Sequence, residues 1–222
     1  IIDRDFDAKV ARTALRPIPS GQISIRTAWA FLIALCLVGL AVLVQFNTYT
    51  IFLGIASLAL VAVYPFMKRI TWWPQAFLGL TFNWGALVGY AAMTGRLDWA
   101  ALALYAAGFF WTLGYDTIYA HQDKEDDALI GVKSSARRLG TATKPALGLF
   151  YGAAIVLLAL SGALAGAHAL YFAALAAPAL HFAVQIRRLD ITDPASCLTV
   201  FRSNREAGLL ALAALLVGAF LP

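Results

Sequence analysis

Apolar residues occur along this chain in long, nearly unbroken stretches, and short polar or charged segments separate them. A stretch of about 20 apolar residues matches the length of a helix that crosses the hydrocarbon core of a bilayer. We predict seven such helices, at residues 27–44, 49–66, 74–93, 99–120, 142–160, 167–186 and 207–221. The pattern therefore predicts an all-α fold, a polytopic transmembrane helical bundle.

Composition supports a membrane protein and argues against a soluble domain. Hydrophobic residues make up 61% of the chain and charged residues 13%, with a mean hydropathy of +0.76, whereas soluble domains carry about 25% charged residues. The net charge of +5 would suggest nucleic-acid binding in a soluble protein. Here the basic residues lie between the apolar stretches, where topology and anionic headgroups account for them. We expect a lipid bilayer as the surroundings and no nucleic-acid partner.

The loops between the predicted helices alternate in charge. Those at residues 1–26, 67–73, 121–144 and 187–205 hold 5, 2, 5 and 4 of the 17 Lys and Arg residues. The opposite loops hold only Arg96. Basic loops face the cytoplasm by the positive-inside rule, and all acids except Asp98 and Asp116 lie on this same side. We expect any chemistry at the cytoplasmic face, or at the matrix face in a mitochondrion.

One acid, Asp116, lies inside the predicted helix 99–120, and an acidic segment follows it. If the helix continues, Asp116, Asp123 and Asp127 lie within about 40° of one another on one face. Carboxylates are costly near hydrocarbon and repel one another, so such a stripe requires a cation. Hard oxygen ligands suit Mg²⁺. The sequence therefore predicts a magnesium and diphosphate site at a membrane surface.

Acid pairs at i,i+4 occur twice, as Asp3/Asp7 and as Asp123/Asp127. Each pair can occupy one helix face, and two acidic faces can hold Mg²⁺ between them while nearby cations neutralise phosphate oxygens. The cations that follow the two pairs include Arg12, Arg16 and Lys133. We expect Lys133 to contact phosphate. A solvated, charge-balanced connector is the alternative for the first segment.

Four segments resemble the UbiA prenyltransferase superfamily: DRDFDAKVARTALRPIPSG (3–21), YPFMKRITWWPQAFLG (64–79), YDTIYAHQDKEDDALIGVKS (115–134) and FRSNREAGLL (201–210). They are most similar to members that act on 4-hydroxybenzoate. The resemblance implies nine helices, with an NDxxDxxxD motif after the second and a DxxxD motif after the sixth. Here the fourth predicted helix carries the second motif. We therefore expect residues 1–222 to form a single membrane-embedded prenyltransferase domain whose first two helices, and the Asn and first Asp of the first motif, precede Ile1.

The resemblance also implies roles for individual residues. Asp3, Asp7, Asp123 and Asp127 match the metal-binding motifs, and Arg12, Arg16 and Lys133 match the basic residues of the substrate site. Lys68 and Arg69 stand where the family meets the aromatic acid, and a guanidinium suits a carboxylate because it binds bidentately. Topology determination is the alternative for this pair. Asp116 and Tyr119 are expected to position the acceptor or to stabilise charge, with polar helix packing as the alternative.

The activity that the resemblance implies is Mg²⁺-dependent transfer of a polyprenyl group from polyprenyl diphosphate to 4-hydroxybenzoate. The bond forms at the ring carbon ortho to the hydroxyl, a step of ubiquinone biosynthesis in a bacterial or mitochondrial inner membrane. Other acceptors of the superfamily remain open: naphthoate, homogentisate, chlorophyllide or haem. A transporter is a further alternative. It is disfavoured because the acids gather at one surface and Asp116 lies only about 10 Å deeper than Asp123.

Overall fold

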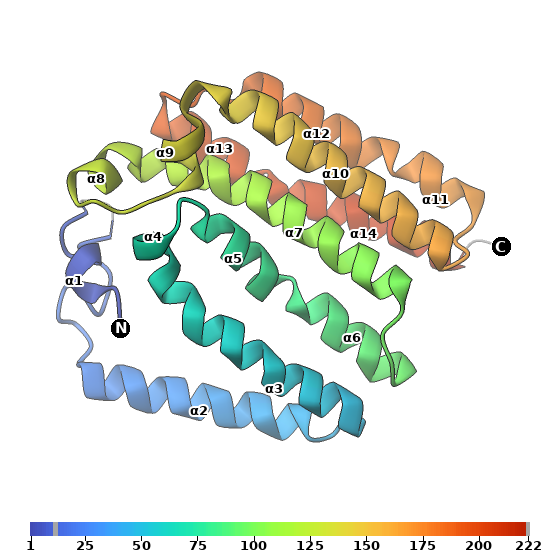
Figure 1. The fold of residues 1–222 in the computed structure, drawn as a ribbon, viewed down its shortest axis with the longest axis horizontal. Helices are drawn as coiled ribbons and strands as arrows, with labels where there is room; N and C mark the ends of the chain where they lie inside the picture. Colours follow the sequence, from blue (N-terminus) through green and yellow to red (C-terminus); the bar gives the residue numbers. More distant parts are fainter. Residues whose placement is uncertain (11–12, 221–222) are drawn as a thin grey trace.

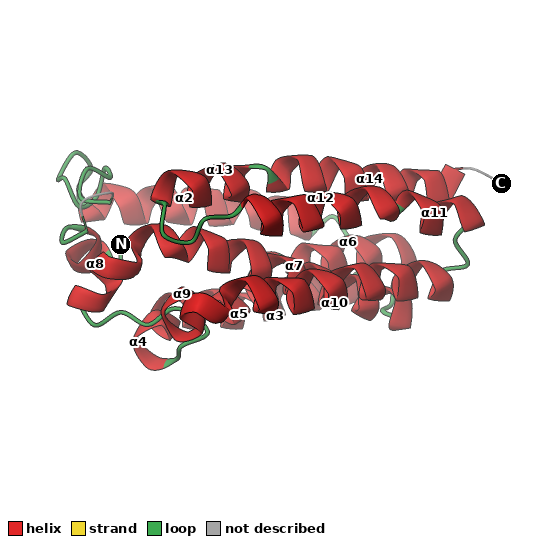
Figure 2. Cartoon of the chain, turned by 90° about the horizontal axis from the view of Figure 1, so that it is seen from above, coloured by secondary structure: helices red, strands yellow, loops and turns green. Residues whose placement is uncertain are grey.

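The structure, a computed structural model, describes residues 1–10 and 13–220, and this part of the chain contains α-helices and 3₁₀ turns but no strand. The helices that form the body run side by side along one direction (Figures 1 and 2). They are α2 (Ile25–Leu43), α3 (Thr48–Val63), α5 (Pro74–Phe82), α6 (Trp84–Thr94), α7 (Trp99–Ala120), α10 (Thr143–Leu164), α11 (Ala169–Ala174), α12 (Ala176–Arg188) and α14 (Asn204–Phe220).

Short helices gather at one end of this body, on the left in Figure 1. They are α1 (Arg4–Asp7), α4 (Met67–Ile70), α8 (Lys124–Leu129), α9 (Ser135–Leu139) and α13 (Pro194–Arg202). The loops that carry most of the charge therefore meet at a single end. This arrangement agrees with the alternation of charge along the sequence.

Five helical segments of the described chain are long and apolar enough to cross a membrane: Ile25–Leu43, Thr48–Ile70, Pro74–Thr94, Ser135–Leu164 and Ala169–Arg188. The protein is thus a multi-pass membrane protein, and the predicted all-α bundle is confirmed. The other two predicted spans are also helical, as α7 and α14. Nine residues of α7 are buried. A helix that packs mainly against protein can carry polar residues that a lipid-facing helix such as α2, with no buried residue, cannot.

The predicted helix 74–93 is divided at Asn83 into α5 and α6. The Asn83 side chain donates from Nδ2 to the Gly79 carbonyl and to Thr112 Oγ1, both at 2.8 Å. An added Cβ at Gly108 would overlap the Asn83 side chain, so α7 approaches the break closely. The Asn83 bond to the Gly79 carbonyl is a side-chain contact that competes with the helical backbone bonds. The predicted helix 167–186 is also divided, into α11 and α12 at Leu175. There Pro178 has no N–H to donate to the Ala174 carbonyl, which removes one helical bond across the break.

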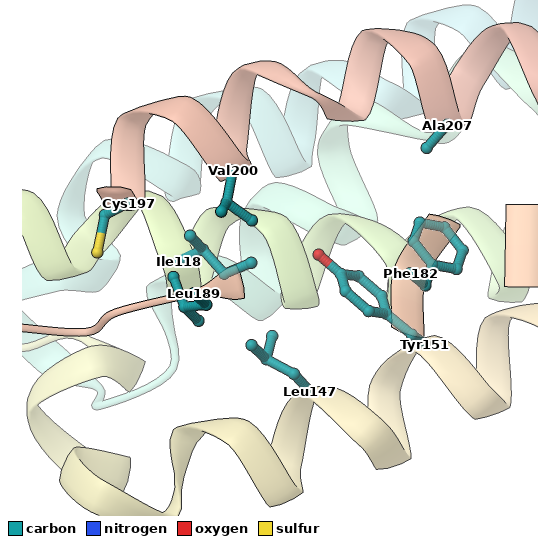
Figure 3. Close-up of a cluster of buried hydrophobic side chains, with 8 residues drawn as sticks. All are labelled: Ile118, Leu147, Tyr151, Phe182, Leu189, Cys197, Val200 and Ala207. Carbon is teal, nitrogen blue, oxygen red and sulfur yellow. The ribbon is translucent and has the colours of Figure 1, made fainter. Parts of the chain in front are cut away.

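The main buried cluster joins the charged end of α7 to α10, α12 and α13. Tyr151 stacks on Phe182 with ring centroids 4.2 Å apart, and Gly114 has no side chain where the Tyr151 ring crosses α7. The cluster consists of Ile118, Leu147, Tyr151, Phe182, Leu189, Cys197, Val200 and Ala207 (Figure 3). Because interiors pack at crystal-like density, this cluster holds the last turns of α7, which carry Asp116, in a fixed position.

Candidate active site

A cavity of about 240 Å³ opens among α1, α4, α7 and α8, at the charged end of the bundle. Four of its lining residues are carboxylates: Asp7 from α1, Asp116 from α7, and Asp123 and Asp127 from the segment that follows α7. The fold therefore brings together acids from the beginning and the middle of the chain. The other lining residues are Phe6, Val10, Thr13, Arg16, Tyr64, Lys68, Gln75, Tyr119, Ala120, Ile130 and Val132.

The backbone that connects Asp116 to Asp127 differs from the continuous helix that was expected. Helix α7 ends at Ala120, a 3₁₀ turn follows at His121–Asp123, and α8 begins at Lys124. The expectation of one straight helical stripe is therefore wrong. Packing explains the change: His121 is buried and its Nε2 forms a hydrogen bond with Thr143 Oγ1 of α10 at 2.9 Å. The carboxylates converge on one cavity because the chain folds around it.

Asp3 binds the two cations of α4. Its carboxylate forms ion pairs with Lys68 Nζ at 2.8 Å and with the Arg69 guanidinium at 3.0 Å. The guanidinium of Arg69 also lies over the Phe6 ring, 4.7 Å from its centroid. The Lys68 and Arg69 pair thus has the geometry to hold a carboxylate, which is the role that the resemblance gives it toward an aromatic acid. In this structure the carboxylate is that of Asp3.

The other predicted substrate contacts differ in position. Arg16 lines the cavity and pairs with Asp7 at 3.2 Å, and Tyr119 lines it while its ring packs on Phe201 with centroids 4.5 Å apart. Lys133 does not line the cavity: its Nζ donates to the Ile70 carbonyl at 3.0 Å. Arg12 lies outside the described residues.

Electrostatics at the acidic segment favour a cation. The pKa of Asp127 is raised to about 6, first by burial and then by the neighbouring Asp123 carboxylate, against the opposing charges of Lys68 and Arg137. Burial lowers the pKa of His121 to about 4, with Lys124 adding to the effect. Its hydrogen bond to Thr143 gives His121 a structural role.

The residues that line the cavity fit a magnesium ion. Within residues 1–10 and 13–220, no group of three or more Asp, Glu, His or Cys side chains is close enough to form a preassembled metal site. The donors around the cavity are nevertheless carboxylates, the hard oxygen ligands that Mg²⁺ takes while keeping several waters. A hydrated ion needs only one or two protein carboxylates. Asp7, Asp123 and Asp127 supply this donor set.

Sequence patterns did not reveal one polar residue of the cavity wall, Gln75. It lies in the first turn of α5, is 6% exposed, and accepts at Oε1 a hydrogen bond of 3.0 Å from the Ser135 backbone N–H. A second bond ties the same two loops, because the Lys133 N–H donates to the Lys68 carbonyl at 2.9 Å. The only signal in the sequence is a polar residue directly after Pro74, at the start of an apolar stretch. No periodicity says which way it faces.

A family model described as the UbiA prenyltransferase family matches residues 1–215 of this sequence. The chain belongs to the UbiA prenyltransferase family. In this chain the acid-lined cavity brings together Asp7 from the first acidic segment and Asp123 and Asp127 from the second.

Known members of the UbiA family are similar in sequence and structure. The chain is 50% identical over 217 residues to the human mitochondrial 4-hydroxybenzoate polyprenyltransferase, covering 97% of this chain and 58% of that protein. It is 49% identical to the Aedes aegypti protein of the same name, covering 97% and 49%. The chain thus spans about half the length of the curated relatives it matches. The solved apo structure of a UbiA homologue from Aeropyrum pernix K1 superposes with a TM-score of 0.81 at 27% identity, covering 97% of this chain and 80% of that one.

Proposed function

We propose that this protein transfers a polyprenyl group from polyprenyl diphosphate to the ring carbon ortho to the hydroxyl of 4-hydroxybenzoate, with Mg²⁺ as cofactor. The observation that carries the proposal is the cavity in which Asp7, Asp116, Asp123 and Asp127 meet beside Arg16 and Lys68. A cavity with both carboxylates and cations suits a magnesium diphosphate. The names of the relatives at about 50% identity support 4-hydroxybenzoate as the acceptor.

The chemistry is an electrophilic aromatic substitution in which each group of the cavity has a task. Bound Mg²⁺ would neutralise the diphosphate and make it a better leaving group. Asp7, Asp123 and Asp127 would hold the cation, and Arg16 would contact phosphate oxygens. Lys68 and Arg69 would bind the carboxylate of the aromatic acid. The bond from the allylic carbon to the diphosphate oxygen breaks, the ring carbon bonds to that allylic carbon, and the ring then loses its proton. Asp116, which lines the cavity, would accept this proton, with Tyr119 one helical turn away.

A second, apolar cavity gives the prenyl chain a place. It has a volume of about 740 Å³, and α2 supplies Trp29, Phe31 and Leu32 to its wall. Asp7 and Tyr64 line both this cavity and the acid-lined one. An apolar space that shares wall residues with the diphosphate site suits a hydrocarbon chain attached to that diphosphate.

Charge distribution supports an orientation and a location. The cavity lies at the end where the basic loops gather, so we propose that it faces the cytoplasm or the mitochondrial matrix. The relatives from Aedes aegypti and human are named as mitochondrial. We propose a bacterial or mitochondrial inner membrane for this protein.

An acceptor panel tests the proposed function. The full-length protein in membranes is incubated with Mg²⁺, a radiolabelled polyprenyl diphosphate and, separately, 4-hydroxybenzoate, a dihydroxynaphthoate or homogentisate. The labelled product is expected with 4-hydroxybenzoate, and its mass should equal that of 3-polyprenyl-4-hydroxybenzoate. If product forms only with one of the other acceptors, the protein is still a prenyltransferase, but its acceptor is not 4-hydroxybenzoate. No product with any acceptor would contradict the proposal.

A further inference from the structure

Gln75 is a buried polar residue of the acid-lined cavity that the reaction as described above does not use. It lies beside Pro74 in the first turn of α5 and is only 6% exposed. Its side chain lines the cavity together with Lys68 and Asp116. Buried amides are usually hydrogen-bonded at both their carbonyl and amino ends, so the partners of Gln75 show what its position permits.

The hydrogen bond from Ser135 fixes the orientation of the Gln75 amide. A backbone N–H can only donate, so the atom that receives it at 3.0 Å is the carbonyl oxygen Oε1. The amino group Nε2 is therefore the end of the side chain that is not used in the bond to Ser135. Within residues 1–10 and 13–220, Nε2 donates to no protein group. The fully enclosed polar side-chain atoms without a partner in that part belong to His121, Tyr151, Gln185 and Glu206, so Nε2 keeps access to the cavity.

Ser135 is itself held rigidly, which makes the Gln75 amide a preorganised donor. Its hydroxyl forms a hydrogen bond of 2.7 Å with Thr117 Oγ1, and both residues are fully buried. Thr117 donates in turn to the Leu113 carbonyl within α7 at 2.6 Å. The amide is thus fixed to α9 and α7 before any ligand binds. A donor that is already ordered loses little conformational entropy on binding.

The surroundings indicate which ligand atom Nε2 would meet. Four carboxylates line the cavity together with two cations, Arg16 and Lys68. Arg16 pairs with Asp7, and Lys68 pairs with Asp3. A ligand that displaces water from this space must offer Nε2 an acceptor, because a buried donor without a partner costs about 1–3 kcal/mol. An anionic oxygen is the strongest acceptor, since charge-assisted hydrogen bonds are roughly twice as strong as neutral ones.

We infer that Gln75 is a substrate-binding residue whose Nε2 group donates a hydrogen bond to an anionic substrate oxygen in the acid-lined cavity. The inference rests on the proposed function. Two substrates of that reaction carry such an oxygen, the diphosphate of the prenyl donor and the carboxylate of the aromatic acid.

Two substitutions distinguish the role of the Gln75 amino group Nε2 from that of the oxygen Oε1, which accepts the bond from Ser135. Gln75→Glu keeps an oxygen to accept from Ser135 N–H and replaces the amino group with a second carboxylate oxygen. Gln75→Met keeps the length and removes both polar ends. The matched control is Gln185→Glu on α12, a residue that is 3% exposed and whose Nε2 donates to Ser203 at 2.8 Å, away from this cavity.

The measurement is calorimetric binding of magnesium pyrophosphate and of 4-hydroxybenzoate to the full-length protein in detergent, together with the melting temperature. Both Gln75 variants are expected to lose at least about tenfold in affinity for one of the two ligands, the effect of about 1.4 kcal/mol. Weakened pyrophosphate binding identifies the diphosphate as the partner, and weakened 4-hydroxybenzoate binding identifies the carboxylate. The control should bind both ligands as the wild type does.

Affinities within twofold of the wild type for both ligands in Gln75→Glu would overturn the inference, and a lowered melting temperature alone would leave Gln75 only a structural role. Failure of the proposed function has a different signature. In that case the unsubstituted protein itself binds neither ligand and forms no prenylated product.

Discussion

Replacing Asp127 with Asn in the full-length protein is expected to reduce prenyl transfer by at least about a hundredfold, the size of loss that follows removal of a group that stabilises developing charge. Asp127 lines the acid-lined cavity with Asp7 and Asp123, and an amide is a much weaker ligand for Mg²⁺ than a carboxylate. The rate of product formation at saturating substrates measures the effect. Raising the Mg²⁺ concentration should restore part of the activity.

Glu125→Gln is the matched control. Glu125 lies on the same short helix α8, is exposed, and loses the same single charge, but it does not line the cavity. Its activity should stay within about twofold of the wild type, as expected for an exposed charge. Asp127→Asn with more than half of the wild-type rate would remove Asp127 from the proposed metal site.

The second large effect is expected at Asp116. Asp116→Asn keeps the size of the side chain in α7 and removes the ability to accept a proton, so kcat should fall by about 10²–10⁴-fold, the usual contribution of a general base. Pyrophosphate affinity should change by less than twofold, because the metal ligands remain. Steady-state kinetics and calorimetry on the same preparation give the two values.

Tyr115→Phe serves as the control on the same helix. Tyr115 precedes Asp116, but it lines a different cavity with Trp111 and Asn204. Removal of its hydroxyl should leave kcat near the wild-type value. If Asp116→Asn turns over normally, or if it loses pyrophosphate binding as well, Asp116 does not act on the acceptor side of the reaction.

The sequence predicts the helices well because their signal is local. A long apolar stretch identifies a spanning helix whatever it packs against, and the predicted segment 99–120 coincides with α7, Trp99–Ala120. Breaks inside helices are harder to predict. The division at Asn83 depends on a hydrogen bond to Thr112, 29 residues later in the chain, and no local pattern contains that partner.

The candidate site also has some features that the sequence predicts and others that depend on contacts between distant residues. Asp7, Asp123 and Asp127 were predicted from acid spacing and from the resemblance, and the structure places all three on one cavity. The straight stripe from Asp116 to Asp127 was wrong, because the packing of His121 against Thr143 ends the helix. Tertiary contacts of this kind override local helical geometry.

Gln75 could not be found from the sequence for a related reason. Its position is defined by the Ser135 backbone, 60 residues away, and a backbone donor leaves no trace in the sequence. For Lys133, in contrast, the sequence predicted one contact and the structure shows another. Its spacing after the acids predicted a phosphate contact, but its ammonium group binds the Ile70 carbonyl. Its phosphate role therefore stays a prediction.

The central claim is that the prenyl diphosphate binds in the cavity where Asp7, Asp123 and Asp127 meet. An experimental structure of the full-length protein with Mg²⁺ and a non-reactive prenyl thiodiphosphate tests it most directly. The account predicts diphosphate density in this cavity, with metal density against at least one of these carboxylates and the prenyl chain toward Trp29 and Leu32 of α2. Diphosphate density instead in the cavity lined by Trp111, Arg202 and Asn204 would contradict it.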